Sequence, residues 1–133
     1  MVELHSWITI RETYEICDND SDDFIKKINK RIQRLKYIEI PVKVMNGEYY
    51  IEFTLFTNHF SEDIKEFIDF FANIGKIAKG SYGLLYIHDD EDAVHNNEFQ
   101  IWKLTRGEIR KCTDRMLSPF VPTIEDFDTE LNV

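Results

Sequence analysis

The sequence contains few residues that cross-link or interrupt a fold: 2 cysteines, 3 prolines and 5 glycines among 133 residues. Cys17 and Cys112 lie far apart, and a chain of this length can bury a sizeable core without a disulfide, so we expect reduced thiols. No linker, repeat or low-complexity stretch divides the chain, and 43% of its residues are hydrophobic. This composition predicts a single globular domain.

Long apolar runs are also absent. No stretch approaches the roughly 20 apolar residues that span a bilayer. A secretion signal has a basic start followed by an apolar run, and the first residues of this sequence have neither. We therefore expect a cytoplasmic protein that does not bind membranes.

Positive charge is scarce: 16 Lys and Arg oppose 25 Asp and Glu, which gives a formal net charge of −9. A negative field of this size repels nucleic acid and attracts cationic proteins. We therefore predict no nucleic-acid partner, although an acidic composition also serves solubility alone.

The first third of the chain predicts a strand followed by a helix. Residues 4–10 alternate with period two, and Trp7 lies on the less apolar face of that strand. Residues 22–36 carry apolar side chains at helical spacing, and Asp20 or Ser21 is the expected N-cap.

A hairpin is predicted next, because Asn46-Gly47 favours the positive φ angles of a two-residue turn. Its strands are predicted over residues 37–45 and 48–56. The turn places Val44 opposite Tyr49, and the apolar pairing continues back to Ile38 opposite Leu55. Pro41 marks the first strand as an edge strand or a bulged one.

A second amphipathic helix is predicted from Ser61, with an apolar face that includes Phe67 and Phe71, and it ends at Lys79-Gly80. Strands are then predicted over residues 84–87, 99–104 and 109–112, and the last two are joined at Arg106-Gly107.

This order of elements predicts an α+β fold, a two-layer sandwich in which two helices pack on a mostly antiparallel sheet. A βαββαβ core of the ferredoxin-like kind plus a C-terminal hairpin fits the order. We expect one domain over residues 1–117. Residues 118–133 contain two prolines and no basic residue, and we predict a loosely attached acidic tail there.

Four consecutive acidic residues, Asp89, Asp90, Glu91 and Asp92, form the densest cluster of charge. Carboxylates can hold hard cations, but a calcium loop needs alternating ligands and glycine at its sixth position, where this chain has Val94. A solvated loop and a patch that contacts a partner are the other two interpretations. We expect no metal and no other cofactor.

Catalytic constellations are not evident in the sequence. The four histidines, His5, His59, His88 and His95, form no HxxxH or HExxH motif, and no CxxC accompanies them. Pairing Cys112 with a histidine would require a convergence in space that no motif indicates. We therefore predict no catalytic residue.

Two further features fit either binding or ordinary structure. The predicted helix 22–36 has a basic face, which could contact RNA or an acidic partner, although a solvated face is the commoner cause. Trp7 and Trp102 each occupy the less apolar side of a predicted strand, where a tryptophan is either an exposed anchor or a packed edge residue.

Several segments together carry a family resemblance: His5-Ser-Trp-Ile-Thr-Ile10, Phe56-Thr-Asn-His59, Gly80-Ser-Tyr-Gly-Leu-Leu-Tyr86 followed by the acidic cluster, and Leu117-Ser-Pro119 with Pro122-Thr-Ile-Glu125. They resemble the immunity protein 7 family of bacterial polymorphic toxin systems. The resemblance implies a small cytosolic protein, encoded beside a secreted toxin, that binds the toxin domain and protects the producing cell. It implies no enzymatic activity.

Within the resemblance, the acidic cluster matches the family's acidic motif and Trp7 matches its tryptophan, so these residues are the candidate toxin contacts. Gly80, Tyr82 and Gly83 are assigned to the fold. An acidic domain is suited to cover a cationic site such as that of a nuclease.

Two alternatives stay open. One is a small metal-dependent enzyme that uses residues 89–92 with His88 or His95, and the other is an RNA-binding regulator that uses helix 22–36. The sequence does not indicate an oligomeric state.

Overall fold

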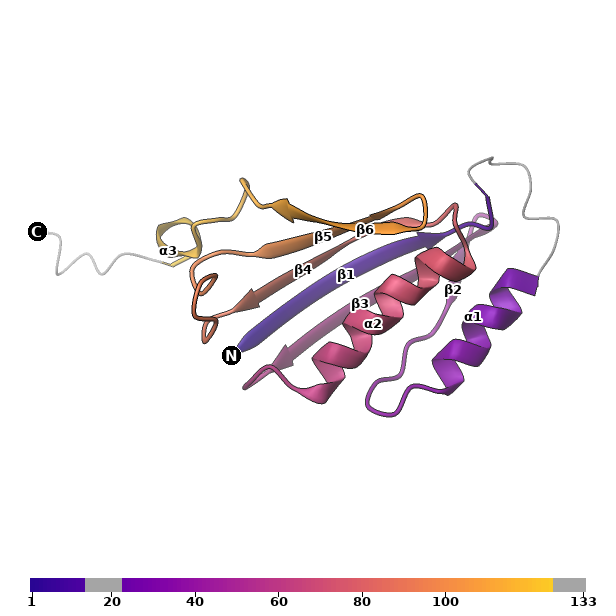
Figure 1. The fold of residues 1–133 in the computed structure, drawn as a ribbon, viewed down its shortest axis with the longest axis horizontal. Helices are drawn as coiled ribbons and strands as arrows, with labels where there is room; N and C mark the ends of the chain where they lie inside the picture. The colour runs from indigo at the N-terminus through magenta and orange to yellow at the C-terminus, as the bar shows by residue number, and fades with distance from the viewer. Residues whose placement is uncertain (14–22, 126–133) are drawn as a thin grey trace, which may run out of the picture.

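The computed structural model describes residues 1–13 and 23–125 and has the predicted α+β fold (Figure 1). The predicted helix cap at Asp20 or Ser21 lies outside these residues. No helix in the described ranges is long and apolar enough to cross a membrane. In chain order, the elements are β1 (Val2–Ile10), α1 (Asp23–Gln33), β2 (Lys43–Met45), β3 (Glu48–Thr57), α2 (Glu62–Ile77), β4 (Tyr82–Asp89), β5 (Gln100–Thr105), β6 (Glu108–Thr113) and the short α3 (Phe120–Thr123).

The six strands form one sheet in the order β2-β3-β1-β4-β5-β6, and all neighbouring strands are antiparallel. The part β2-β3-β1-β4, with α1 after β1 and α2 after β3, has the predicted βαββαβ order. The predicted C-terminal hairpin extends this core as β5 and β6. A long sheet results, with β2 and β6 at its edges.

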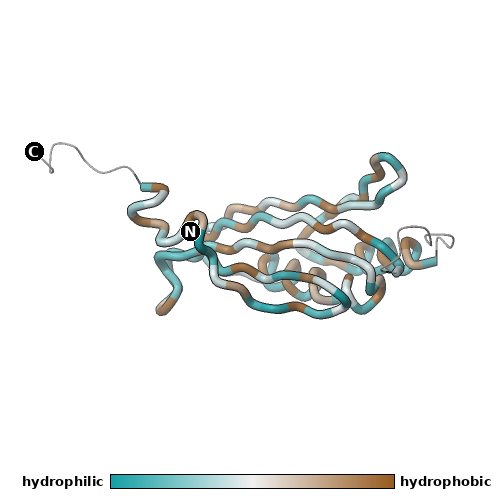
Figure 2. Tube along the Cα trace, turned by 90° about the horizontal axis from the view of Figure 1, so that it is seen from above, coloured by the Kyte–Doolittle hydropathy of each residue, from teal (hydrophilic) through white to brown (hydrophobic). Residues whose placement is uncertain are grey.

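Both long helices cover the same face of the sheet (Figure 1). Along β1, buried residues alternate with more accessible ones, and hydrophobic and hydrophilic residues alternate along much of the rest of the sheet (Figure 2). The buried set, including Leu4 and Ile8, faces the helices. We call the other side, where Trp7 lies, the open face.

The core between the layers is rich in phenylalanine. Phe67, Phe70 and Phe71 of α2 are fully buried, and Phe53 of β3 stacks on Phe67 with ring centroids 4.4 Å apart. The helical stripe predicted from the sequence omits Phe70. The packing of α1 beside α2 widens the covered face of α2 and brings Phe70 into the core.

The predicted hairpin forms with the correct turn but with a much shorter first strand. Asn46 and Gly47 have φ angles of 52° and 78°, and Val44 pairs with Tyr49 as predicted. The prediction of a strand over 37–42 is wrong. The carboxylate of Glu66 accepts the backbone N–H groups of Lys36 and Tyr37, at 2.9 to 3.1 Å. These bonds hold the chain against α2 and away from β3.

The first residues of the predicted acidic tail are attached to the body of the protein. The side chain of Asn97 accepts a hydrogen bond from Val121 N at 2.7 Å and donates one to Val121 O at 3.1 Å. Ser118 Oγ accepts the backbone N–H of Phe99 at 2.8 Å. The predicted tail thus makes hydrogen bonds to the body of the protein at Ser118 and Val121, and residues 126–133 lie outside the described ranges.

Candidate binding surface on the open face

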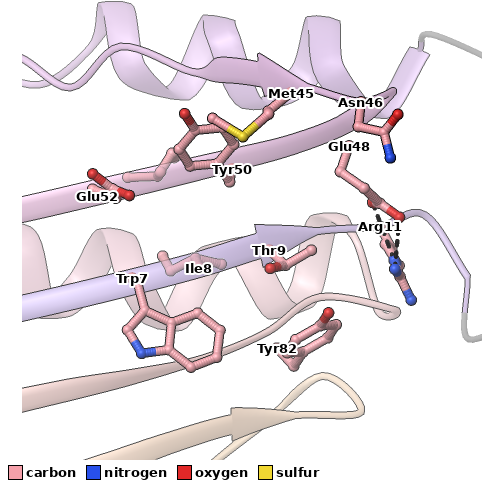
Figure 3. A pocket seen from close by; sticks show the side chains of 11 residues that line it. Trp7, Ile8, Thr9, Arg11, Met45, Asn46, Glu48, Tyr50, Glu52 and Tyr82 are labelled. Carbon is pink, nitrogen blue, oxygen red and sulfur yellow. Dashed lines mark hydrogen bonds and ion pairs between the residues drawn. The ribbon is translucent and has the colours of Figure 1, made fainter.

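Trp7 lies in the middle of β1 and leaves 42% of its surface exposed on the open face. Its ring meets the ring of Tyr82 from β4 edge to face, with centroids 6.0 Å apart. Beside Trp7 is a hollow of about 450 Å³. In Figure 3, Thr9 forms its floor, with Tyr50 and Met45 on one side and Trp7 and Tyr82 on the other. We call this cavity the Trp7 hollow.

An ion pair closes one end of the Trp7 hollow. Arg11 donates two hydrogen bonds to the carboxylate of Glu48, from Nη2 at 2.6 Å and from Nε at 3.2 Å (Figure 3). The hydrogen bond to Glu48 raises the pKa of Arg11 above its ordinary value, although partial burial opposes this. The same guanidinium lies 5.5 Å from the centroid of Tyr82. Two-point bonding of this kind fixes the shape of the hollow.

The segment Gly80-Ser-Tyr-Gly83 positions Tyr82, which forms part of the wall of the hollow. A Cβ atom at Gly83 would lie 2.2 Å from Trp7 O, and one at Gly80 would lie 1.8 Å from Thr13 O. The buried hydroxyl of Ser81 accepts the backbone N–H of Arg11 at 3.2 Å. The two glycines and Ser81 therefore hold the end of β1 close to β4 and set the position of Tyr82.

Sequence reasoning assigned Tyr82 to the fold alone and missed its place in the wall of the hollow. Tyr82 pairs with Thr9 in the register of β1 with β4. That register brings Tyr82 diagonally next to Trp7, within the reach of aromatic side chains. No local pattern in the sequence predicts that these two strands are neighbours.

The acidic cluster lies at the opposite end of the sheet. Asp89 pairs with Val2, whereas Leu84 pairs with Trp7. Five residues of strand therefore separate the cluster from Trp7, a distance of roughly 17 Å. The structure thus does not bring the predicted contact residues together in one site.

Two carboxylates of the cluster bind groups from other parts of the chain. Asp90 Oδ1 lies 2.5 Å from the N-terminal ammonium of Met1, and this hydrogen bond lowers the pKa of Asp90. Both carboxylate oxygens of Glu91 lie 3.0 Å from Nδ1 of His59. The cluster is thereby connected to the Phe56-Thr-Asn-His59 segment at the end of β3.

The other two carboxylates of the cluster organise the backbone of their own loop. Asp92 Oδ1 accepts the N–H groups of His95 at 2.7 Å and Val94 at 2.8 Å, and these bonds lower the pKa of Asp92. Asp89 accepts the N–H of Glu91 at 3.0 Å. No two of the four carboxylates share one of these partners, so they do not converge on a common point.

The described residues do not support a metal centre. No group of three or more His, Cys, Asp or Glu side chains within residues 1–13 and 23–125 is placed to hold a metal ion. In particular, His88 is buried, and its Nε2 lies 2.8 Å from the carbonyl oxygen of Asn96. This geometry gives no support to the alternative of a metal-dependent enzyme that uses residues 89–92.

A second hollow of about 510 Å³ lies further along the open face, next to residues 114–125, which we call the C-terminal arm. Its walls include His5, Tyr86 and Ile101 from the sheet and Leu117 and Ile124 from the arm. Sequence analysis did not predict this hollow, because it requires the arm to fold back on the sheet.

Asp114 organises the first residues of the arm, and Phe120 attaches the arm to the sheet. The carboxylate of Asp114 accepts hydrogen bonds from Met116 N, Leu117 N and Ser118 Oγ, at 2.8 to 3.1 Å. Burial opposes ionisation of Asp114, but these bonds outweigh burial and lower its pKa. The ring of Phe120 stacks on His88, with centroids 4.0 Å apart.

The remaining candidates from the sequence lie on the helix side. Trp102 is partly buried and packs against the core, with Lys111 Nζ 5.4 Å from its ring centroid. It is therefore a packed residue, whereas Trp7 is exposed. The basic residues of α1 that are fully exposed also lie away from the open face: Lys26, Lys27 and Lys30.

Comparison with known proteins gives one finding. Residues 1–126 match the family model described as "Immunity protein 7". No curated protein and no solved structure matches the chain. The match covers the whole sheet, both long helices and the described part of the C-terminal arm.

Proposed function

The chain belongs to the immunity protein 7 family, and from this membership we propose that it binds a cognate toxin domain and blocks it in the cytoplasm of the producing cell. The match over residues 1–126 is the observation that carries the proposal. Immunity by binding requires a surface that the toxin can cover. It does not require a catalytic site.

The open face is the surface that best fits this role. The helices bury the other face, whereas the open face exposes Trp7 and Phe56 and contains both hollows. Exposed aromatic side chains beside preformed cavities are typical of the anchors that dominate binding energy at protein interfaces. We propose that the toxin covers the open face and that Trp7 is the main anchor.

The acidic cluster, Asp89, Asp90, Glu91 and Asp92, has a different role in this proposal. It lies at the end of the sheet, and its Asp90 and Glu91 stay exposed to solvent despite their internal contacts. Charges at the rim of an interface act mainly on the rate of association. We propose that the cluster and the net charge of −9 attract a cationic toxin, for example a nuclease.

Co-expression with the toxin domain encoded next to this gene tests the proposal. We expect survival of cells that make both proteins, death of cells that make the toxin alone, and copurification of the two chains as a stable complex. The decisive readout is binding, measured with purified proteins.

A variant of the open face separates inhibition by binding from indirect protection. Trp7→Ala should weaken both the complex and the rescue while the protein stays folded. Death of cells despite normal levels of the unaltered protein, together with no complex, would contradict the immunity role.

A further inference from the structure

The Trp7 hollow combines aromatic walls with an acidic mouth. Tyr50 and Tyr82 lie on either side of Thr9, and Trp7, two residues from Thr9 along β1, pairs with Glu52 at the end of the hollow away from the Arg11–Glu48 pair (Figure 3). A side chain that entered there would lie between two aromatic rings, with a carboxylate at the end of the slot.

The carboxylate of Glu52 is available to a ligand. Its side chain is 64% exposed, and its ion-pair contact among the described residues is with Lys43 Nζ at 3.9 Å. Exposed pairs at this distance contribute little, so a better-placed cation can replace Lys43. By contrast, Glu48 is held by two hydrogen bonds from Arg11. Glu52 is therefore the acidic group in the hollow that a ligand can reach most easily.

The protein already places one of its own cations at this site. Arg11 lies against the ring of Tyr82, with its guanidinium carbon 5.5 Å from the ring centroid. This contact is within the range over which a cation is attracted to the face of an aromatic ring. The aromatic rings of the hollow are therefore suited to a cationic neighbour. Arg11 occupies only the end of the hollow next to Glu48.

From these observations we infer that the Trp7 hollow binds the side chain of an arginine or a lysine from the partner protein. The aliphatic stem lies between Tyr50 and Trp7, and the charged head group meets Glu52. The net charge of −9 favours the same occupant. The identity of the partner as a toxin rests on the proposed function, but the chemistry of the occupant rests on the hollow and the net charge.

Short peptides test the occupant without any toxin. The probes are capped Gly-Arg-Gly, the same peptide with neutral citrulline in place of arginine, and the same peptide with apolar norleucine. They are titrated into the ¹⁵N-labelled full-length protein, and the indole N–H signals of Trp7 and Trp102 are followed. Trp102 is an internal control, because it packs on the helix side of the sheet.

We expect the arginine peptide to shift the Trp7 signal in a saturable way, with a Kd on the order of 1 to 10 mM, and to leave the Trp102 signal in place. Citrulline and norleucine should bind at least about tenfold more weakly, because they lack the charge. Glu52→Gln should weaken the arginine peptide about fivefold. The matched variant Glu108→Gln removes the same charge outside the hollow and should have no effect.

The inference is wrong if norleucine or citrulline binds as tightly as arginine, or if the arginine peptide gives no saturable shift at about 50 mM. It is also wrong if Glu108→Gln weakens binding as much as Glu52→Gln does, since general charge would then explain the effect. If the arginine peptide does not bind but the protein still rescues cells from the toxin, the hollow is not a cation site and the immunity role is unaffected. A positive peptide result without rescue supports the hollow as a cation site and contradicts the immunity role.

Discussion

The Trp7 hollow and the acidic end of the sheet, residues 89–92 with His59, use their polar side chains in opposite ways. At the acidic end, the carboxylates hold the N-terminus, His59 and the backbone of their own loop. At the hollow, the Arg11–Glu48 pair closes one end while the aromatic walls and Glu52 stay accessible. The densest cluster of charge thus has a large structural role, and the less conspicuous aromatic region is the surface that we propose for binding.

This contrast shows why a motif cannot be equated with a contact surface. The acidic motif and the Phe56-Thr-Asn-His59 segment meet through the contact of Glu91 with His59. The Gly80-Ser-Tyr-Gly83 segment and the Trp7 strand meet at the hollow. Each pair of motif segments has a structural reason to occur together, and the second pair borders the Trp7 hollow.

The largest expected effect concerns the backbone behind the Trp7 hollow. Gly83→Ala should lower the free energy of unfolding by about 3 kcal/mol, because its Cβ would collide with Trp7 O and no rotation of a side chain can relieve the clash. Denaturant unfolding with an unchanged m-value measures this loss. Gly47→Ala is the control. Its Cβ meets nothing within 4 Å, so only the positive φ of 78° opposes it, at about 1 kcal/mol. Equal losses in the two variants would contradict the close approach of β1 and β4.

The next effect tests the hollow as the anchor of the interface. Trp7→Ala should weaken the toxin complex by about 2 kcal/mol, or about 30-fold in Kd, mainly through faster dissociation. Its stability should change by at most about 1 kcal/mol, because the ring is exposed and has one aromatic neighbour, Tyr82. Biolayer interferometry gives both rates. Tyr37→Ala removes another exposed aromatic side chain and should leave binding unchanged. A similar loss in both variants would remove the special role of Trp7.

A third effect concerns the C-terminal arm. At pH 7, Asp114→Ala should lower the free energy of unfolding by about 1.5 kcal/mol, because three donors lose an ionised acceptor. The folded-state pKa of Asp114 lies below its ordinary value of 3.8, so its stabilisation is fully present above that value. It is lost as the pH falls through the folded-state pKa. The difference in free energy of unfolding between the two proteins should therefore shrink as the pH falls below 3.8. If the difference in free energy of unfolding between the two proteins did not change with pH, the charge of Asp114 would not be involved.

The smallest effect concerns the acidic cluster. Replacing residues 89–92 by their amides should slow association with a cationic toxin about fivefold at low salt and leave dissociation unchanged. The fold should persist, because amide oxygens still accept the backbone hydrogen bonds of the loop. Stopped-flow association at two salt concentrations measures the change. The matched control neutralises four exposed acids outside the cluster: Glu39, Glu62, Asp69 and Glu108. An equal slowing by the control would assign the effect to net charge alone.

Features that depend on a few neighbouring residues were predictable from the sequence. The Asn46-Gly47 turn follows from the tolerance of both residues for positive φ, and the structure confirms it. The place of Trp7 on the less apolar face follows from the period-two alternation of β1, whereas its exposure was left open by the sequence. The α+β class and the βαββαβ order follow from the sequence of such local patterns.

The tertiary structure alone decided what the local patterns leave open. Residues 37–42 have strand-like alternation, yet hydrogen bonds to Glu66 from α2 draw the start of this segment away from the sheet. The Trp7 hollow requires β1 between β3 and β4, because Tyr50 and Tyr82 reach it from those two strands. Local sequence determines the conformation of each element, because φ, ψ and side-chain periodicity depend on near neighbours. It does not determine which elements become neighbours, because that choice depends on burying apolar surfaces from distant parts of the chain in one core.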